Sequence, residues 1–496
     1  DVCSSDLVRG ITNRLFSNLT DAQSASATSI TAVSTTGYTV GSENGFNQSP
    51  NAFVGWTFRK QPKFFDVVTW TGNGVNGRAI SHALGSTPGT IIVKCTSAAE
   101  NWFVWHRSKS SEIGVLNTTD AFGTYVAGYQ AAEVFGNGTS VVQPTSTDFT
   151  VAQYGATNQS SRTYVAYLFA HDAGGFGLSN SDNVISCGSY TGNGSATGPT
   201  VTLGYELQWM LFKQSSASGN DWQLYDIMRG LVNNTNGGDN GLFPNTSAAE
   251  DVNATIIKPT ATGFQLESSA AAVNASGATY IYIAIRRGPM KTPTTGTSVF
   301  APALASSSGT YTATSNFPVD WAIEGQRAGS TKFYAGTRLI GNATLQPNTT
   351  GAESAQSWGF DNMTGFTLPG VAGDYSGFIN WMMRRAPGFF DVVCYTGTGS
   401  TTTQAHNLGV APELMIVKRR ASTSADWAVW NKSLSSSNIL SLNTTDAAYA
   451  SGTSFNSTAP TSSVFTVGSA GATNGSGSTY VAYLFASCPG VSKVGS

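Results

Sequence analysis

Histidine is the residue type in this chain best suited to acid–base or metal chemistry, and it occurs at positions 82, 106, 171 and 406. His82 and His406 occupy the same place in two similar stretches, SHALG and AHNLG, where an imidazole could serve as a general base or a metal ligand. A third such stretch, VTLG, has Val201 at that place. Because a chemistry shared by these stretches cannot need the imidazole, we expect a hydrogen-bonded His at the edge of a strand. His106 aligns with Asn431, which favours a polar surface position.

Other signatures of catalysis are missing from the sequence. It has no Ser-His-Asp arrangement, no H-E-x-x-H zinc motif and no phosphate-binding G-x-x-x-x-G-K-[ST] loop. Its 28 Asp and Glu residues are too sparse to suggest an acid/base pair by spacing, although a pair assembled from distant loops stays open. We therefore predict that the chain is not an enzyme and that it needs no metal and no cofactor.

Tryptophan could contact a ligand, since an aromatic face can stack on a sugar ring. Trp102, Trp222 and Trp427 recur at one register, which favours packing in a core because a large ring contributes most when it is buried. Trp358, in QSWGF, has no counterpart in the similar stretches and is our candidate for an exposed ligand contact. GGDNG at residues 237–241 could bind Ca²⁺ through oxygen ligands, but one Asp among glycines is more typical of a turn.

The composition excludes several classes of partner. Lys and Arg number 26 against 28 Asp and Glu, a net charge of −2, which gives no electrostatic basis for binding nucleic acid or anionic lipid. The longest apolar runs, such as YIYIAI at Tyr280–Ile285, are far shorter than the roughly 20 residues of a membrane-spanning helix. Cysteines at positions 3, 95, 187, 394 and 488 form no CxxC pair, and we interpret them as small buried side chains. We expect no nucleic-acid partner and no membrane span.

The elements that must position these residues recur along the chain. A stretch such as STDFTV at Ser146–Val151 is followed, after about 12–16 residues, by an apolar run such as YVAYLF, and this pair occurs five times. Four copies have a beginning such as FFDVVTWTGNG at Phe64–Gly74, then runs such as TIIVK and NWFVWH and a turn such as LNTTDA. Equivalent residues are about 100–115 apart, so each unit is a small domain. Runs of β-branched and aromatic residues between Gly, Ser and Asn favour buried strands.

We therefore predict an all-β fold of tandem β-sandwich repeats, of jelly-roll or concanavalin-like type, without significant helix. The expected segments are residues 1–7, a non-native leader; 8–61, the C-terminal half of a truncated unit; 62–172, a repeat; 173–183, a Gly-rich linker; 184–289, a repeat; 296–386, a divergent repeat; 388–487, a repeat; and 488–496, the start of a further truncated unit.

Five unit ends with only four beginnings indicate that the first unit lacks its front half. VRGITN at Val8–Asn13 aligns with MRGLVN at Met228–Asn233, in the middle of the third unit. The stretch DVCSSDL before it matches no unit, and we interpret it as translated sequencing adapter. We expect an interior piece of a longer tandem-repeat protein. The alternative is that a second copy supplies the missing strands by edge addition.

Connectors between units are short in three places. Basic pairs at residues 59–60, 286–287 and 384–385 are each followed closely by Pro, and Pro-bearing connectors hold neighbouring domains at a restricted angle. We therefore expect a semi-rigid string of units, with a hinge at residues 173–183.

The motifs SYTGNG, H-x-L-G, IVKRR, DWAVW, LNTTDA and TYVAYLFA together resemble an uncharacterised repeat of predicted structural proteins in marine tailed phages. Those proteins are labelled tail fibres and often lie beside concanavalin-like jelly-roll modules. The resemblance extends over nearly the whole chain from Val8 and is weakest at residues 296–386, which lack the TGNG and IVKRR runs. It implies no catalytic residues.

The resemblance and the repeated small domains lead us to expect a virion structural protein, a fragment of a tail-fibre-like appendage on the particle exterior that extends and presents a host-contacting surface. It would form a homo-oligomer, with a trimer as one option, beside other virion proteins, and a host surface glycan is a candidate partner. The alternative is a bacterial surface adhesin or a secreted lectin-like carbohydrate-binding protein, located at the cell surface or outside the cell. A polysaccharide depolymerase would show a long parallel β-helix repeat, which this sequence lacks.

Overall fold

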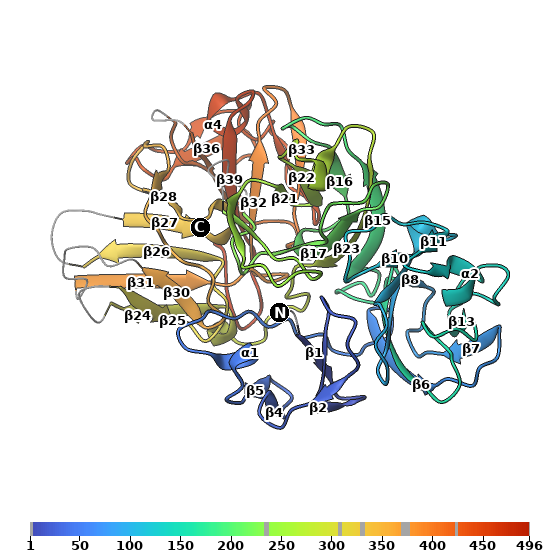
Figure 1. Cartoon of the computed structure of the whole chain (residues 1–496). Helices are drawn as coiled ribbons and strands as arrows, with labels where there is room; N and C mark the ends of the chain where they lie inside the picture. Colours follow the sequence, from blue (N-terminus) through green and yellow to red (C-terminus); the bar gives the residue numbers. More distant parts are fainter. Residues whose placement is uncertain are drawn as a thin grey trace.

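The structure is a computed structural model, and it describes residues 3–232, 238–305, 310–327, 333–368, 377–421 and 425–495. The described helices are single turns: α1 (Asn44–Asn47), α2 (Ala131–Val134), α3 (Ala271–Asn274), α4 (Gly471–Asn474) and the 3-10 turns η1 (Arg107–Lys109), η2 (Gly296–Ser298) and η3 (Arg338–Ile340). The rest of the regular structure is antiparallel strand (Figure 1), which confirms the all-β class. Within the described ranges, no helix is long and apolar enough to cross a bilayer.

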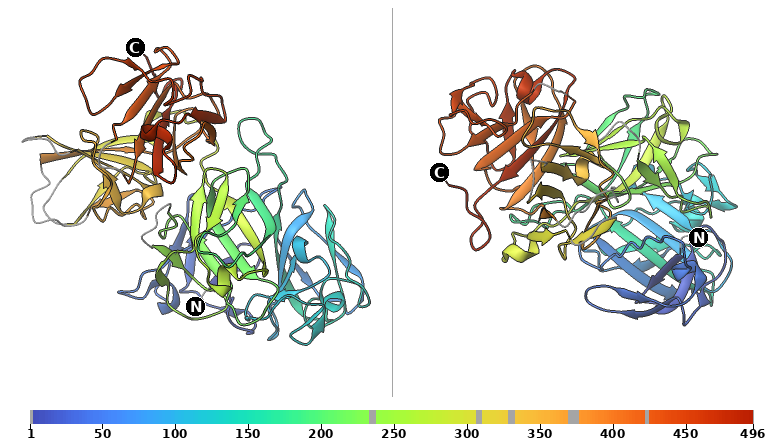
Figure 2. Two further views of the ribbon diagram at one scale, coloured as in Figure 1. Left: turned by 90° about the horizontal axis from the view of Figure 1, so that it is seen from above. Right: turned by 90° about the vertical axis from the view of Figure 1, so that its left-hand side faces the viewer.

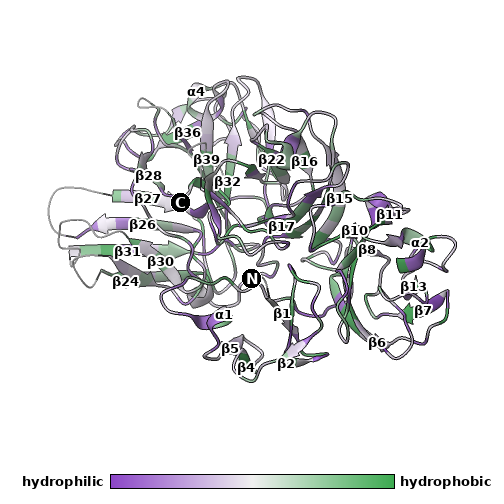
Figure 3. Cartoon of the chain, in the orientation of Figure 1, coloured by the Kyte–Doolittle hydropathy of each residue, from purple (hydrophilic) through white to green (hydrophobic). Residues whose placement is uncertain are grey.

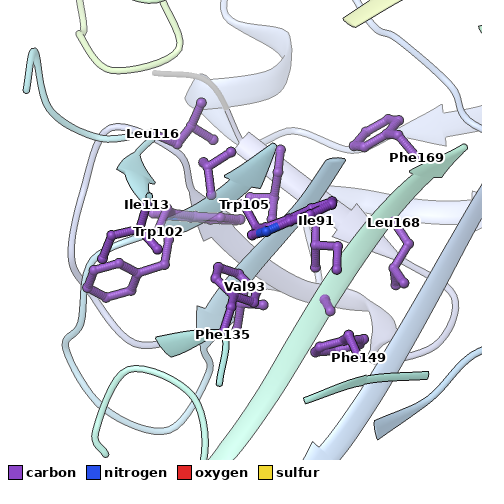
Figure 4. Close-up of a cluster of buried hydrophobic side chains, with 14 of the residues drawn as sticks. Ile91, Val93, Trp102, Trp105, Ile113, Leu116, Phe135, Phe149, Leu168 and Phe169 are labelled. Carbon is purple, nitrogen blue, oxygen red and sulfur yellow. The ribbon is translucent and has the colours of Figure 1, made fainter. Parts of the chain in front are cut away.

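The second unit, residues 62–172, shows the plan of all the units: a large sheet packed against a small one. The large sheet has the order β10-β9-β8-β14-β6 and the small sheet is β13-β7. The strands are β6 (Phe65–Thr71), β7 (Arg78–Ser81), β8 (Pro88–Cys95), β9 (Phe103–His106), β10 (Gly114–Val115), β13 (Asp148–Val151) and β14 (Thr163–Ala170), with a hairpin of β11 (Tyr125–Val126) and β12 (Tyr129–Gln130). Phe149 of the small sheet contacts Trp70 of the large one, with ring centroids 5.8 Å apart. Figure 4 shows Phe149 with Val93, Ile91 and Leu168 of the large sheet in this core.

The third unit, residues 184–289, and the fifth, residues 388–487, repeat this plan. The large sheets have the orders β15-β23-β17-β18 and β32-β39-β34-β35-β36-β37. The third unit consists of β15 (Ile185–Thr191), β16 (Thr200–Thr202), β17 (Leu207–Gln214), β18 (Gln223–Asp226), β19 (Asp239–Gly241), β20 (Asp251–Ala254), β21 (Ile257–Thr260), β22 (Gly263–Leu266) and β23 (Thr279–Arg286). The fifth consists of β32 (Phe390–Thr396), β33 (Thr402–Ala405), β34 (Leu414–Arg419), β35 (Ala428–Asn431), β36 (Asn438–Ser441), β37 (Tyr449–Ala450), β38 (Val464–Val467) and β39 (Thr479–Phe485).

The fourth unit, residues 296–386, keeps the plan although its sequence departs most from the others. Its large sheet has the order β24-β31-β26-β27-β28-β29 and its small sheet is β25-β30. The strands are β24 (Phe300–Leu304), β25 (Tyr311–Thr314), β26 (Trp321–Gln326), β27 (Phe333–Thr337), β28 (Ala343–Leu345), β29 (Ser354–Ala355), β30 (Gly365–Leu368) and β31 (Phe378–Met383). The core between its two sheets includes Phe360, Phe366 and Met382.

The N-terminal segment, residues 3–61, forms the sheet β1-β2-β3 and the hairpin β4-β5. Its strands are β1 (Cys3–Asp6), β2 (Gly10–Phe16), β3 (Ser24–Ala25), β4 (Ile30–Val33) and β5 (Tyr38–Val40). Asp6 Oδ2 accepts a hydrogen bond from Arg9 Nε at 2.6 Å, as Asp226 Oδ2 does from Arg229 Nε at 2.7 Å in the third unit. Cys3–Asp6 therefore take the place that Gln223–Asp226 occupy in the third unit, and the non-native origin of residues 1–7 stays a prediction. The apolar residues of the two strands differ, but the Asp that closes the strand and the Arg after it keep their spacing.

The units pack against one another through shared hydrophobic cores, which the expected semi-rigid string of units did not include. One hydrophobic core joins the large sheets of the second and third units, and another joins those of the fourth and fifth. The two further views show the N-terminal half gathered in one lobe and the fourth and fifth units in another (Figure 2). Many hydrophobic residues lie on the strands of the large sheets (Figure 3), and in the third unit both faces of the large sheet belong to hydrophobic cores. The Gly-rich stretch at residues 173–183, our predicted hinge, forms a loop closed by the bridge between Phe176 and Asp182.

Candidate functional site

In three of the units, an asparagine in the turn that follows the third strand binds that strand and so fixes the turn. In the second unit, Asn117 Oδ1 accepts the Trp102 amide at 2.8 Å and Asn117 Nδ2 donates to Asn101 Oδ1 at 2.8 Å. The same pair of bonds joins Asn245 to Trp222 and Asp221, and Asn443 to Trp427 and Asp426. These contacts explain why the DW and NT motifs recur together. They leave the backbone carbonyls of the turn free to accept hydrogen bonds.

A buried lysine lies opposite the indole in three of the units. Lys94, Lys213 and Lys418 each donate to a carbonyl of their own unit, at 2.6, 2.5 and 2.6 Å. Burial lowers the pKa of each ammonium to about 8, so the three groups remain charged at neutral pH. A buried charge needs more than one acceptor to offset the loss of water.

The turn of the preceding segment supplies the missing acceptors. Where the second unit meets the third, Lys213 Nζ donates to Thr119 O at 3.1 Å and Trp222 Nε1 donates to Val115 O at 2.9 Å. The amide of Phe122 donates back to Ser215 O at 3.0 Å. We call this set of three bonds a joint, the accepting residues 115–119 the joint turn, and the two donors the Lys–Trp pair.

The same joint occurs at two other places with the same spacing. Between the N-terminal segment and the second unit, Lys94 donates to Thr20 O at 2.7 Å, Trp102 Nε1 to Phe16 O at 3.0 Å, and Gln23 N to Thr96 O at 2.9 Å. Between the fourth and fifth units, Lys418 donates to Thr350 O at 2.9 Å, Trp427 Nε1 to Gln346 O at 3.2 Å, and Glu353 N to Arg420 O at 2.8 Å. The joint turns are therefore residues 16–20, 115–119 and 346–350. Hydrogen bonds from a charged donor are stronger than those between neutral groups. Here they join neighbouring segments whose joint turns differ in sequence.

The fourth unit lacks the Lys–Trp pair. The pairing of β26 with β27 and β31 places Gly325 and Phe333 where Lys418 and Trp427 lie in the fifth unit. The corresponding turn of the third unit, residues 243–247, is contacted instead by the N-terminal segment, since Ser17 Oγ donates to Pro244 O at 2.6 Å.

An ion-pair cluster connects the third, fourth and fifth units in place of that joint. Arg385 donates to both carboxylate oxygens of Glu206, at 2.6 and 2.8 Å. Asp320 is buried and lies against the guanidinium groups of Arg287, Arg338 and Arg385. Burial alone would raise the pKa of Asp320, but these cations outweigh it and lower the pKa to about 2.

The histidines occupy structural positions. His82 Nδ1 and His406 Nδ1 accept the amides of Leu84 and Leu408, at 3.3 and 3.2 Å, and burial lowers the pKa of both rings. The expectation of an ordinary hydrogen-bonded His is confirmed for these two. The expected surface position of His106 is wrong, because the third unit covers it and its Nε2 lies 3.2 Å from Tyr282 O.

Trp358 is not the exposed ring that we expected. It is 5% exposed and its ring packs against Phe360 and Phe366, with centroids 6.3 and 5.2 Å away. The ring also lies over Gly336, where a Cβ would be 2.6 Å from the indole. Trp358 has no counterpart because it fills a space specific to the fourth unit.

The proposed calcium ligand in GGDNG is also engaged elsewhere. Asp239 Oδ2 accepts the amides of Ile256 and Ile257, at 2.7 and 2.8 Å, and burial raises the pKa of this carboxyl to about 7. Gly237 lies outside the described residues. Within the described ranges, no three His, Cys, Asp or Glu side chains gather as a metal site would require. The described cysteine thiols, at positions 95, 187, 394 and 488, are buried and free.

A second recurring side chain was missed by our reading of the sequence. Asn158, Asn274 and Asn474 are fully buried, and each binds the backbone of the turn that begins its unit. Asn474, for example, accepts the Thr398 amide at 2.8 Å and donates to Ser400 O at 2.6 Å. The signal was present in the recurring GATN and AAVN stretches before each last strand.

Comparison with known families finds a match over most of the chain. The model of a domain of unknown function, DUF7483, matches residues 2–289 and 382–496. The chain belongs to the DUF7483 family. The DUF7483 match includes all three Lys–Trp pairs and omits residues 290–381, which contain most of the fourth unit. No curated protein and no solved structure matches the chain.

Proposed function

We propose that this DUF7483 protein is a virion structural protein, part of a tail-fibre-like appendage that extends from the particle and presents a host-contacting surface. The observation that supports this best is the joint, which occurs with the same three bonds at Lys94, Lys213 and Lys418. A joint built from one lysine, one indole and backbone carbonyls lets similar domains be added in series at small cost in sequence.

The appendage is proposed to be a homo-oligomer, with a trimer as one option, that contacts other virion proteins. Light scattering of the purified chain would give the mass in solution, which for a trimer is three times the 51.7 kDa of one chain. A single-chain mass at micromolar concentration would contradict the oligomer.

Immunogold labelling tests the location. Antibodies against the purified chain should decorate the exterior of phage particles released from a host culture whose phage encodes it. Label on the bacterial envelope, in a culture without particles, would contradict the virion assignment and favour the adhesin. A glycan array with the whole chain would test the host-contact role, for which binding to a surface polysaccharide is expected.

A further inference from the structure

The turn of the fifth unit has the form of a joint turn but no partner among the described residues. Ser441 O accepts the Thr444 amide at 3.3 Å, as Phe16 O and Gln346 O accept the amides of Leu19 and Thr349, at 3.2 and 3.1 Å. Leu442 is 48% exposed, whereas its equivalent in the second unit, Leu116, is 6% exposed under the third unit. Residues 441–445 therefore form a joint turn in which Ser441 is buried within the fifth unit, while no other unit among the described residues covers residues 442–445.

The sheet face beside this turn is open as well. Leu414, Asn431 and Phe485 are only partly buried and line a hollow of about 300 Å³ against residues 492–495. Their equivalents in the second unit are Thr90, His106 and Phe169, which are buried. Two of these, Thr90 and His106, lie against Leu211, Trp222 and Ile281 of the third unit. The same surface is thus closed by a neighbouring unit in the second unit, whereas in the fifth only the tail at residues 492–495 lies against it among the described residues.

The backbone leaves the fifth unit by the turn that leads from one unit to the next. The pairs Cys488–Ser492, Ala386–Phe390 and Gln61–Phe65 each form the same antiparallel bridge. The residue two places after the first member has a positive φ in each case, 75° at Gly490, 75° at Gly388 and 65° at Lys63. At the two earlier places the chain continues into the first strand of a large sheet.

We propose that this face of the fifth unit is a docking surface for a further unit of the same kind, one that follows the Cys488–Ser492 turn and has its own Lys–Trp pair. Its lysine would donate to Thr445 O and its indole to Ser441 O, the equivalents of Thr119 O and Val115 O. The Ala448 amide would donate to the carbonyl two residues beyond that lysine, as the Phe122 amide does to Ser215 O.

A second copy of the chain fits this surface less well. The Lys–Trp pairs at Lys94, Lys213 and Lys418 are each already bonded to a joint turn. A second copy would have to open one of its own joints to supply the donors. A unit without a prior partner has both donors free.

The test is an extended chain in which residues 1–487 are followed by a second copy of residues 386–496. Amide hydrogen exchange would be measured at Ala448 of the first copy, with the amides of Gln23, Phe122 and Glu353 as internal references because they make the equivalent bond. We expect exchange at Ala448 to be fast in the original chain and at least tenfold slower in the extended one. Unchanged exchange at Ala448, with the three references slow, would overturn the proposal.

Matched variants separate docking from mere attachment. Replacing Lys418 and Trp427 with Ala in the appended copy alone should restore fast exchange at Ala448, and Leu442→Asp in the first copy should do the same. If exchange at Ala448 remains slow in these variants, docking does not depend on the Lys–Trp pair and the proposal fails. Fast exchange at the appended unit's own amides would show that this unit is unfolded. That result also overturns the proposal, because the same sequence folds as the fifth unit when a neighbouring unit covers it. Slow exchange at Ala448 in the original chain that depends on protein concentration would assign the surface to a second copy instead.

Discussion

At the scale of single residues, this protein keeps several ionisable groups in its interior, and their protonation affects its stability in opposite directions. The three joint lysines keep their charge because backbone carbonyls replace water around them. Asp320 keeps its charge because guanidinium groups surround it. Glu324 is buried, and within the described residues it has no ion pair and one of its oxygens has no hydrogen-bond partner.

Replacing Lys213 with Met should weaken the joint between the second and third units. The change leaves Asn220 O without its donor and removes one of the two donors to Thr119 O, which keeps the Gly219 amide, and an unsatisfied buried polar group costs about 1–3 kcal/mol. We expect the Phe122 amide to exchange at least tenfold faster. Lys291→Met, at an exposed lysine, is the control and should leave the Phe122 exchange rate unchanged. Equal rates in both variants would contradict a role for Lys213.

Glu324→Gln should stabilise the protein at alkaline pH. Burial raises the pKa of Glu324 to about 7, so the folded state keeps a proton that the unfolded chain loses above its ordinary pKa of about 4.3. Stability therefore falls as pH rises from about 4.3 to 7, by roughly 1–3 kcal/mol. The Gln variant escapes this loss, and thermal unfolding should show it to be more stable at pH 8 and similar at pH 4. Asp446→Asn, at an exposed carboxylate, should show no such difference between the two pH values.

Asp320→Asn should destabilise the contact between the third and fourth units, because Arg287 of the third unit lies against this carboxylate. The depressed pKa means that the carboxylate contributes stability above its unfolded pKa of about 3.9, and this contribution is lost as pH falls toward 2. Removing one member of a buried ion cluster costs about 3–5 kcal/mol because the remaining charges lose their partner. Urea unfolding at pH 7 should show the loss. Asp182→Asn, in a more exposed pair with Arg286, should cost less than about 1 kcal/mol.

At the scale of elements, a unit depends on turns that are bound from a distance in sequence. The Gly399 turn begins the fifth unit, and Gly399 has φ +75°, where a side chain would be strained. Its amide donates to Asn474 O at 2.8 Å. The one-turn helix before the last strand therefore fixes the turn after the first.

Asn474→Ala tests that connection. The side chain is fully buried and bonds Thr398 N, Ser400 O and Gly468 O, so its removal should lower the free energy of unfolding by about 2–4 kcal/mol. The measurement is urea unfolding of the fifth unit followed by the fluorescence of its tryptophans. Thr401→Ala, at an exposed position in the same turn, should change it by less than about 0.5 kcal/mol. If Thr401→Ala lowered the free energy of unfolding as much as Asn474→Ala does, the proposed role of the Asn474 side chain would be contradicted.

The strands themselves could be predicted from sequence, and what covers their outer faces could not. Runs such as YVAYLF predict strands buried on both faces, which β14 and β39 confirm. Recurring tryptophans predict a core position, and Trp102, Trp222 and Trp427 are buried. However, a pattern of apolar residues predicts that a face is buried, but it does not predict which segment of the chain covers that face. A lysine at the end of an apolar strand is typical of an exposed strand end, so its burial depends on carbonyls that lie far away in sequence.

At the scale of the whole molecule, the units form packed pairs in place of the predicted string. Two of the Pro-bearing connectors, at Pro62 and Pro387, form turns closed by the bridges Gln61–Phe65 and Ala386–Phe390. Because these connectors are short, each large sheet folds back onto its neighbour and the chain of units is not extended. The sheets pack because their outer faces are apolar. Exposing these faces to water would cost more free energy than holding the connector in one conformation does.

The joints have unequal requirements on their two sides. Donors must be a particular lysine and a particular indole, whereas the acceptors are main-chain oxygens that any residue type offers, as FSNLT, VLNTT and QPNTT do. Sequence drift is therefore tolerated on the accepting side and penalised on the donating side. The fourth unit illustrates the outcome: with Gly325 and Phe333 it cannot donate backward, yet residues 346–350 still accept the fifth unit. Relatives in this family should accordingly diverge faster at the turn positions around the shared Asn, and slowest at the buried Lys and Trp positions of each domain.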